Sequence, residues 1–122
     1  MKLNPDCVRF VLIMVEKETG HNKTFMIPAA GVQDPEFTAD EIFYHINQCK
    51  DAGLLGKVTK NVLGEYEIFD LSPKGHEFLS NIRENTVWNK TKQISKSAGI
   101  ATMSTLVQIA SAVISDVISK NL

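Results

Sequence analysis

The sequence predicts an α+β domain in which several helices surround a small antiparallel β-hairpin. Three observations favour this fold class. Residues 38–53 carry the start signal, the apolar spacing and the glycine stop of one amphipathic helix. Residues 54–60 and 65–71 are two strand-like runs joined by a turn sequence, which is the pattern of a hairpin. After the hairpin, the apolar residues recur at helical spacing only.

The chain before residue 38 predicts one helix, one strand and one loop. Asparagine is a good N-cap and proline suits the first helical position, so Asn4 and Pro5 predict the start of a helix. This helix should reach about Glu18, and because it is apolar on nearly every side it should be the most buried helix of the fold. Residues 23–27 indicate a short edge strand. Residues 28–37 hold two prolines and a glycine and predict a loop.

The helix over residues 38–53 is the best-specified element. Thr38 and Glu41 form a capping box that fixes the helix start, and Gly53 supplies a left-handed stop. A narrow apolar stripe faces the core and consists of Ile42, Ile46 and Cys49. The polar side faces away from the core and carries Tyr44, Asn47, Gln48 and Asp51. We expect any binding function to lie on this polar side.

Three more helices are predicted after the hairpin. The first begins with Ser72 and Pro73 and reaches about Arg83. The second has Thr86 as its N-cap and ends at Gly99. The last spans residues 103–120 and is apolar along one side for more than four turns. That apolar side contains Met103, Leu106, Val107, Ala110, Val113, Ile114, Val117 and Ile118.

Length and composition indicate one soluble domain. A chain of 122 residues with 43% hydrophobic content can bury a core without disulfides or metals. We expect a single domain over residues 1–122, with a core of residues 1–83 and a helical extension of residues 84–122. The N-terminus lacks the basic-then-apolar pattern of a secretory signal, so we expect a cytoplasmic protein whose Cys7 and Cys49 stay reduced.

Several functional classes are disfavoured. His45 and Cys49 stand four residues apart, but no paired C-x-x-C or H-x-x-x-H motif accompanies them, so no metal site is predicted. No activated nucleophile or catalytic carboxylate pair is recognisable, so we expect no enzyme, no cofactor and no small-molecule substrate. No continuous run of about 20 apolar residues exists, so no membrane span is predicted.

The order of helix, strand, helix, hairpin and helix is that of winged-helix domains, in which the helix before the hairpin enters the DNA major groove. The runs HINQCKDAGLL and DLSPKGHEFL resemble the end of a winged-helix recognition helix and the segment that closes the wing in bacterial regulators. Over almost the full length, the chain also resembles a family of small uncharacterised bacterial and prophage proteins, classed as a domain of unknown function. The runs that carry this resemblance are NPDCVRFVL, FYHINQCKDAGLL, LSPKGHEFLSNIRENTVWNKTK and LVQIASAVI. It implies a winged-helix-like core with helical C-terminal additions and no assigned activity.

The first functional hypothesis is a non-catalytic regulator that binds double-stranded DNA. The net charge is -1, so such a site must be a local patch. The predicted contacts are Tyr44, Asn47 and Gln48 to bases, and Lys50, Lys57, Lys60 and Lys74 to phosphates. Two features oppose this hypothesis. The loop 28–37 replaces the usual supporting helix, and the acids Asp40, Glu41 and Asp51 on the recognition helix would repel phosphates.

The alternative is a protein-interaction module. Residues 97–115 contain no charge, so their helix offers little repulsion to a partner protein or to a second copy of the chain. The predicted partner contacts are Leu106, Ile109 and Val113. The same apolar side is equally suited to cover the helix of residues 5–18 within its own chain.

Overall fold

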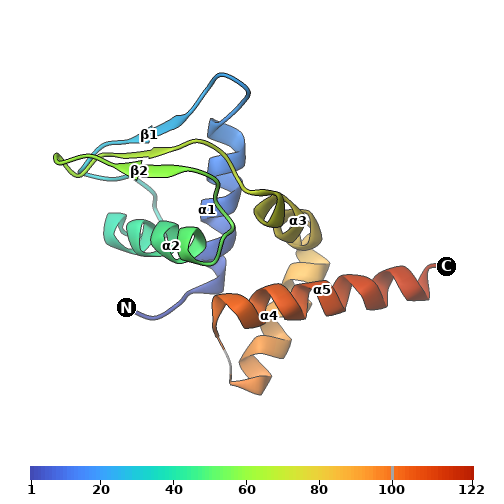
Figure 1. The fold of residues 1–122 in the computed structure, drawn as a ribbon. Helices are drawn as coiled ribbons and strands as arrows, with labels where there is room; N and C mark the ends of the chain where they lie inside the picture. Colours follow the sequence, from blue (N-terminus) through green and yellow to red (C-terminus); the bar gives the residue numbers. More distant parts are fainter. Residues whose placement is uncertain (100) are drawn as a thin grey trace.

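The computed structural model describes residues 1–99 and 101–122, and these form five helices and one three-stranded antiparallel sheet. The predicted α+β class is therefore confirmed. In chain order the elements are α1 (Pro5–Glu18), β1 (Phe25–Ile27), α2 (Ala39–Asp51), β2 (Val58–Lys60), β3 (Tyr66–Ile68), α3 (Pro73–Ile82), α4 (Asn85–Ala98) and α5 (Met103–Lys120). The sheet and α2 lie on one side of α1, and α3, α4 and α5 lie on the other (Figure 1).

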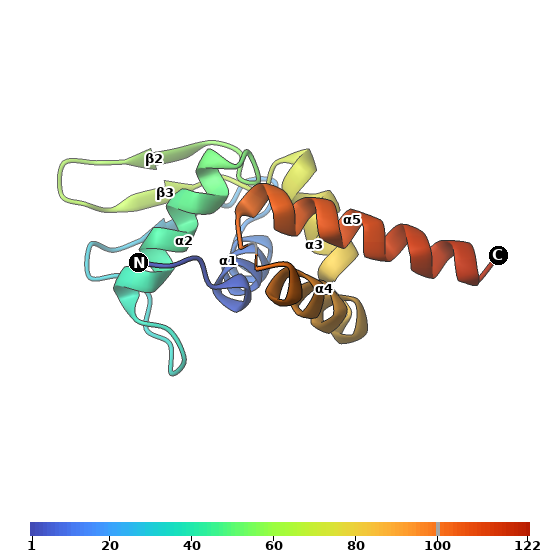
Figure 2. The ribbon, with the colours of Figure 1, turned by 90° about the horizontal axis from the view of Figure 1, so that it is seen from below.

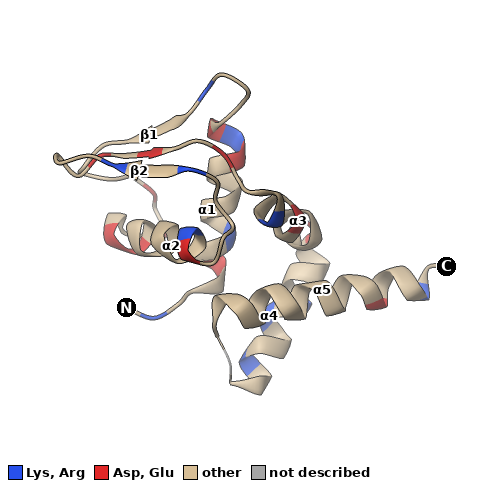
Figure 3. Ribbon diagram, viewed as in Figure 1, with Lys and Arg blue, Asp and Glu red and all other residues tan. Residues whose placement is uncertain are grey.

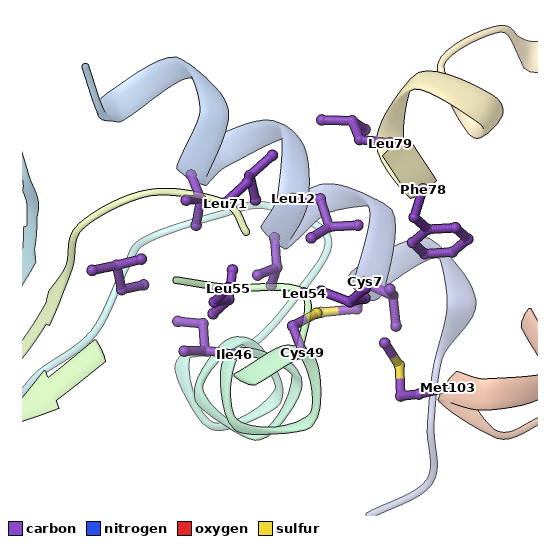
Figure 4. Close-up of a cluster of buried hydrophobic side chains, with 14 of the residues drawn as sticks. Cys7, Leu12, Ile46, Cys49, Leu54, Leu55, Leu71, Phe78, Leu79 and Met103 are labelled. Carbon is purple, nitrogen blue, oxygen red and sulfur yellow. The ribbon is translucent and has the colours of Figure 1, made fainter. Parts of the chain in front are cut away.

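Helix α1 is the centre of the core, as its apolar sequence predicts. The Asn4 side chain caps its first turn by accepting a hydrogen bond from the Asp6 amide at 3.1 Å. Its buried residues are Cys7, Val8, Val11, Leu12 and Val15. The helix packs against α2 and α3, and Figure 4 shows the side chains that surround it. Full burial of one such aliphatic side chain contributes roughly 1.5–3 kcal/mol, so α1 supplies much of the stability of the fold.

The capping box and the glycine stop of α2 are both confirmed. The Thr38 hydroxyl accepts a hydrogen bond from the Glu41 amide, and the Glu41 carboxylate accepts one from the Thr38 amide, each at 3.1 Å. Gly53 follows the helix with φ of 76°, a conformation that glycine adopts without strain. These two local signals fix where α2 begins and ends.

The hairpin forms as predicted and joins a third strand. The order in the sheet is β1-β3-β2, so both neighbours of the central strand β3 are antiparallel edge strands. Tyr66 and Ile68 are buried whereas Glu67 between them is half-buried, which follows from the alternation of side chains along a strand. One face of the sheet therefore covers the core. The predicted edge strand is β1, and residues 28–37 form a loop as predicted.

Helix α4 starts earlier than the sequence indicates. Its N-cap is Glu84, whose side chain makes no capping hydrogen bond, and not the predicted Thr86. A distant residue explains the difference, because the Arg9 guanidinium donates to the Arg83 carbonyl at 2.6 Å and to Asn85 Oδ1 at 3.1 Å. Helix α1 thus holds the first turn of α4 in place, and no local pattern reveals such a contact.

Helix α5 packs mainly on α4 and α3. Its buried residues are Met103, Leu106, Ala110 and Val113, so the predicted apolar side is buried only in the first part of the helix. Val117 is 36% exposed and Ile118 is 53% exposed. The last turns of α5 extend beyond the other helices (Figure 2). The apolar spacing predicts the bounds of α5 correctly. It does not predict that α5 packs on α4 and α3.

The carboxylate of Asp6 connects α1 to α4. Its Oδ1 accepts hydrogen bonds from the Trp88 indole N–H at 3.0 Å and from the Lys92 ammonium at 2.9 Å. Partial burial by itself would raise the pKa of Asp6. The two hydrogen bonds and the positive charges of Lys92 and Arg9 outweigh that effect and hold the pKa below its usual value of 3.8.

The stability that Asp6 supplies should therefore depend on pH. Since its pKa is lower in the folded state, the contribution is complete above the usual value of 3.8 and is lost as the pH falls through the lowered pKa. An Asp6→Asn variant should melt below the wild type at pH 7, and the two should melt at similar temperatures at about pH 2. Fluorescence of Trp88, the single tryptophan, measures this melting. An equal difference in melting temperature at both pH values would contradict the assignment.

Candidate nucleic-acid interface

The side of α2 that faces away from its apolar stripe holds two of the three predicted base-reading residues, Tyr44 and Gln48. Tyr44 and Gln48 are half-buried and Lys50 is exposed. The Tyr44 ring packs edge-on against the His45 ring, with 5.0 Å between the centroids. This contact orients the tyrosine while leaving part of its ring accessible. Tyr44 and Gln48 therefore lie where the sequence predicts them.

Asn47 does not face away from the protein, contrary to the sequence prediction. Its side-chain amide donates to the Tyr66 hydroxyl at 3.0 Å and to the Phe43 carbonyl at 3.1 Å. Helix α2 lies against the hairpin, and the phenol of Tyr66, which is nearly buried, takes Asn47 as its partner. Asn47 could contact a base only if its hydrogen bonds to Tyr66 and Phe43 were broken. Asn47 thus links α2 to the hairpin in this structure.

The four predicted phosphate-binding lysines are all exposed. Lys57 and Lys60 extend over aromatic rings of β3 and the segment after it, with Nζ 4.9 Å from the Phe69 centroid and 5.6 Å from the Tyr66 centroid. Lys74, at the start of α3, donates to the Ala52 carbonyl at 3.1 Å and so reaches the end of α2. Basic segments on β2, at the end of α2 and at the start of α3 lie on the same side of the molecule (Figure 3).

We call this surface the helix–wing face, and it consists of Tyr44, Asn47, Gln48, Lys50, Lys57, Lys60 and Lys74. The contact of Lys60 with Tyr66, and of Tyr66 with Asn47, joins the hairpin to α2 within it. The structure thus brings together residues from three separate elements. Polar side chains and ammonium groups of this kind can contact base edges and phosphates, respectively.

An exposed acidic residue lies at each end of α2, beside the helix–wing face. Asp40 and Asp51 are exposed, and both would repel a phosphate. Glu41 is different, because its carboxylate accepts the Thr38 amide in the capping box. The exposed lysines lie beside the C-terminal end of α2 and on the hairpin. A polyanion would therefore approach from the hairpin side.

Helix α5 lies beside the helix–wing face. The sequence does not predict this position of α5. A cleft of about 300 Å³ lies between the end of α2 and the start of α5. It is lined by Gln48, Asp51, Ala52, Lys74, Met103, Ser104 and Val107. Two predicted contact residues, Gln48 and Lys74, thus share a cleft with the helical extension.

His45, which the sequence suggested only as a weak metal ligand, is fully buried and has a structural role. Its Nε2 accepts a hydrogen bond from the Asn4 amide at 2.8 Å, so the proton is on Nδ1, which donates to the Glu41 carbonyl at 2.7 Å. Both ring nitrogens are therefore occupied. Within residues 1–99 and 101–122, no group of three or more His, Cys, Asp or Glu side chains is placed to hold a metal ion.

The two cysteines are buried free thiols. Burial, together with the negative charges of Glu41 and Asp34, raises the pKa of Cys7 to about 12. Burial also raises the pKa of Cys49, with a further increase from Cys7. Both thiols therefore remain protonated near neutral pH, and neither is an activated nucleophile.

The predicted partner contacts on α5 need correction. Leu106 is fully buried and Val113 is 4% exposed, because both pack inside their own chain. Ile109 is half-buried and lines a groove of about 240 Å³ between α4 and α5. The exposed apolar residues of this region are instead Ile94, Val117, Ile118 and Leu122. None of the helices in residues 1–99 and 101–122 combines the length and apolar character needed to cross a bilayer.

Comparisons with known proteins place the chain in a family. A relative from Haemophilus influenzae, named "Uncharacterized protein", is 29% identical over 126 residues that cover 98% of this chain and all of the relative. No solved structure shows a significant match. The family model described as "Hypothetical protein (DUF2513)" matches residues 2–101, which include the whole helix–wing face. The chain therefore belongs to the DUF2513 family of bacterial hypothetical proteins, as its sequence motifs indicate.

Proposed function

We propose that this protein is a non-catalytic winged-helix protein that binds double-stranded DNA through the helix–wing face. The observation that carries the proposal is that four exposed lysines lie on α2, on the hairpin and at the start of α3, and that the backbone segments carrying them lie on the same side of the molecule (Figure 3). The strand order β1-β3-β2 and the position of α2 directly before the hairpin support the winged-helix assignment. A regulator of bacterial or prophage DNA, acting in the cytoplasm, fits this activity.

The loop before α2 has contacts that substitute for the missing supporting helix. Asp34 Oδ2 accepts hydrogen bonds from the amides of Glu36 and Phe37, at 2.9 and 3.3 Å. The Phe37 ring then packs on Phe10 of α1, with 5.3 Å between the centroids. The residue immediately before the Thr38 cap is thereby anchored to the core. A loop held in this way presents α2 in a fixed orientation, which base recognition requires.

In this mode the lysines supply most of the affinity and α2 supplies selectivity. Neutralising phosphates releases condensed cations from DNA, and this effect is independent of sequence. Gln48 offers the amide that pairs with adenine in the major groove, and Tyr44 offers a hydroxyl donor. Asp40 and Asp51 oppose close approach of the backbone at the two ends of α2. We therefore expect affinity to depend strongly on the hairpin lysines.

A charge-reversal pair tests this expectation. The Lys57→Glu/Lys60→Glu variant should bind a fluorescein-labelled duplex of mixed sequence about tenfold or more weakly than the wild type at low salt. Fluorescence polarisation measures the dissociation constant. A Lys23→Glu/Lys96→Glu variant changes the net charge equally, at exposed positions outside the helix–wing face, and should bind as the wild type does. Equal loss of affinity in both variants would show that net charge alone governs binding and would contradict the proposal.

Self-association through the end of α5 is a second candidate function. It is favoured by the exposure of Ile118 (53%) and Leu122 (99%) on turns that project beyond the other helices. An apolar helix end of this kind is suited to pack against a second copy. Sedimentation equilibrium should then show a dimer that an Ile118→Asp change dissociates. A monomer at high protein concentration would remove this candidate.

A further inference from the structure

The cleft between α2 and α5 lies between two helix ends that are both held in place (Figure 2). At the start of α5, the Thr102 side chain accepts a hydrogen bond from the Thr105 amide at 3.1 Å. Met103, the first residue of that helix, is buried in the core. At the end of α2, the Ser72 hydroxyl donates to the Gly53 carbonyl at 2.5 Å. The walls of the cleft are therefore preorganised, which lowers the cost of ordering them around a ligand.

Groups of opposite charge line this cleft. Lys74 and Asp51 are both lining residues, and both are exposed, so a bound molecule can reach them. The Lys74 ammonium donates to the Ala52 carbonyl at 3.1 Å. This bond uses one of its three N–H donors and fixes the side chain, while the other donors can bind an anion. The carboxylate of Asp51, the last residue of α2, can accept hydrogen bonds from a cation.

The rest of the lining is mainly apolar. Met103 is 7% exposed, and Val107 and Ala52 are half-buried. The volume of about 300 Å³ is at the lower end of the range for small-molecule sites, so the cleft has room for one small ligand. A ligand that satisfies all of these groups carries one carboxylate, one ammonium group and a short aliphatic chain. Aliphatic α-amino acids have this chemistry, whereas a simple carboxylic acid or amine would satisfy only one of the two charged side chains.

We propose that the cleft between α2 and α5 binds an aliphatic α-amino acid. The carboxylate of the ligand contacts Lys74, its ammonium group contacts Asp51, and its side chain packs on Met103 and Val107. Lys74 and Gln48 belong both to this cleft and to the helix–wing face. The amino acid should therefore compete with DNA, a consequence that rests on the proposed function. Because binding is reciprocal, each ligand should weaken the other by the same factor.

Nuclear magnetic resonance of protein labelled at its methionine methyl groups tests the site without DNA. L-Leucine should shift the methyl resonance of Met103 and leave that of Met26, exposed on β1, unchanged. Two probes of the same shape each lack one charge: L-leucinamide lacks the carboxylate, and 4-methylpentanoate lacks the ammonium group. Each should bind about tenfold or more weakly than L-leucine, because a hydrogen bond between charged groups is lost.

Substitutions in the cleft provide the second part of the test. Asp51→Asn and Lys74→Gln should each weaken L-leucine binding about tenfold. Asp40→Asn is the matched control, because Asp40 is the exposed acid at the other end of α2, and this variant should bind L-leucine as the wild type does. In fluorescence polarisation, saturating L-leucine should weaken duplex binding to the wild type by about fivefold or more. The same L-leucine concentration should have little effect on duplex binding to the Asp51→Asn variant.

The outcomes separate this inference from the proposed function. A Met103 resonance that does not respond to L-leucine, or equal affinity for the three probes, would contradict the amino-acid site whether or not the protein binds DNA. If L-leucine binds as expected but the wild type binds no duplex, the site stands and the proposed function fails. If both ligands bind without affecting each other, the competition is wrong. Near-ultraviolet circular dichroism checks that each variant keeps its fold.

Discussion

Replacing Gly75 by alanine should destabilise the protein by about 3–5 kcal/mol, a large part of the roughly 5–15 kcal/mol that stabilises an ordinary domain. A Cβ atom at position 75 would lie 1.9 Å from the Leu54 carbonyl oxygen. That oxygen belongs to the backbone and is fixed, because it accepts a hydrogen bond from the Ser72 amide at 3.0 Å. Alanine inside a helix is ordinarily favoured over glycine by about 1 kcal/mol, so the steric effect opposes and exceeds the propensity effect.

Urea denaturation followed by Trp88 fluorescence measures the loss. Gly20→Ala is the matched control, because its Cβ would meet only the Lys23 side chain at 4.0 Å. The control should unfold close to the wild-type urea concentration. A Gly75→Ala variant as stable as the control would show that α3 does not rest directly on the Leu54 backbone. The packing of α3 described above would then be wrong.

Replacing His45 by phenylalanine should cost about 2 kcal/mol, although the side chains are similar in size. The change removes the acceptor of the Asn4 amide and the donor to the Glu41 carbonyl. Asn4 is the N-cap residue of α1. When its amide loses the hydrogen bond to His45, the N-cap residue should become more mobile. Hydrogen exchange at the Asn4 amide should accelerate, and the urea midpoint should fall.

His21→Phe is the control for this substitution, because His21 is exposed. It should change neither the urea midpoint nor the exchange rate at Asn4. His45→Gln keeps a polar group at the site and should lose less stability than His45→Phe. Unchanged exchange at Asn4 in the His45→Phe variant would contradict the hydrogen bond between the two residues.

The sequence predicts those parts of the fold that depend on local signals. The capping box of Thr38 and Glu41, the stop at Gly53 and the start of α3 after Ser72 all appear in the structure where expected. Each arises from hydrogen bonds or backbone angles within a few residues. The hairpin belongs to the same class, since its turn residues and its alternating side chains are neighbours in sequence.

The parts that the sequence does not predict depend on distant contacts. The start of α4 follows Arg9, and the buried position of His45 follows from its contact with Asn4, 41 residues away. Asn47 is turned toward the hairpin by Tyr66. The apolar side of α5 predicts a buried surface but does not identify what covers it, so the sequence alone also allows Leu106 to be an interface residue, whereas it is a core residue.

The candidate site likewise combines features that local sequence signals predict with features that depend on distant contacts. The exposed lysines could be identified from sequence as solvent-facing, and the order of elements indicated that they would lie near α2. The approach of Lys74 to the end of α2 depends on the placement of α3, through the hydrogen bond from Lys74 to the Ala52 carbonyl and the close packing of Gly75 on the Leu54 backbone. The cleft shared by Gln48 and Ser104 depends on the position of α5, which no local pattern fixes.

The salt dependence of duplex binding tests the central claim most directly. The logarithm of the affinity should fall linearly with the logarithm of salt concentration, with a slope of about −0.9 for each phosphate neutralised and hence about −3.6 for the four lysines. The Lys57→Glu/Lys60→Glu variant should have a slope smaller in magnitude by about 2. A wild-type slope near zero, or an identical slope in this variant, would show that the helix–wing face does not bind DNA phosphates.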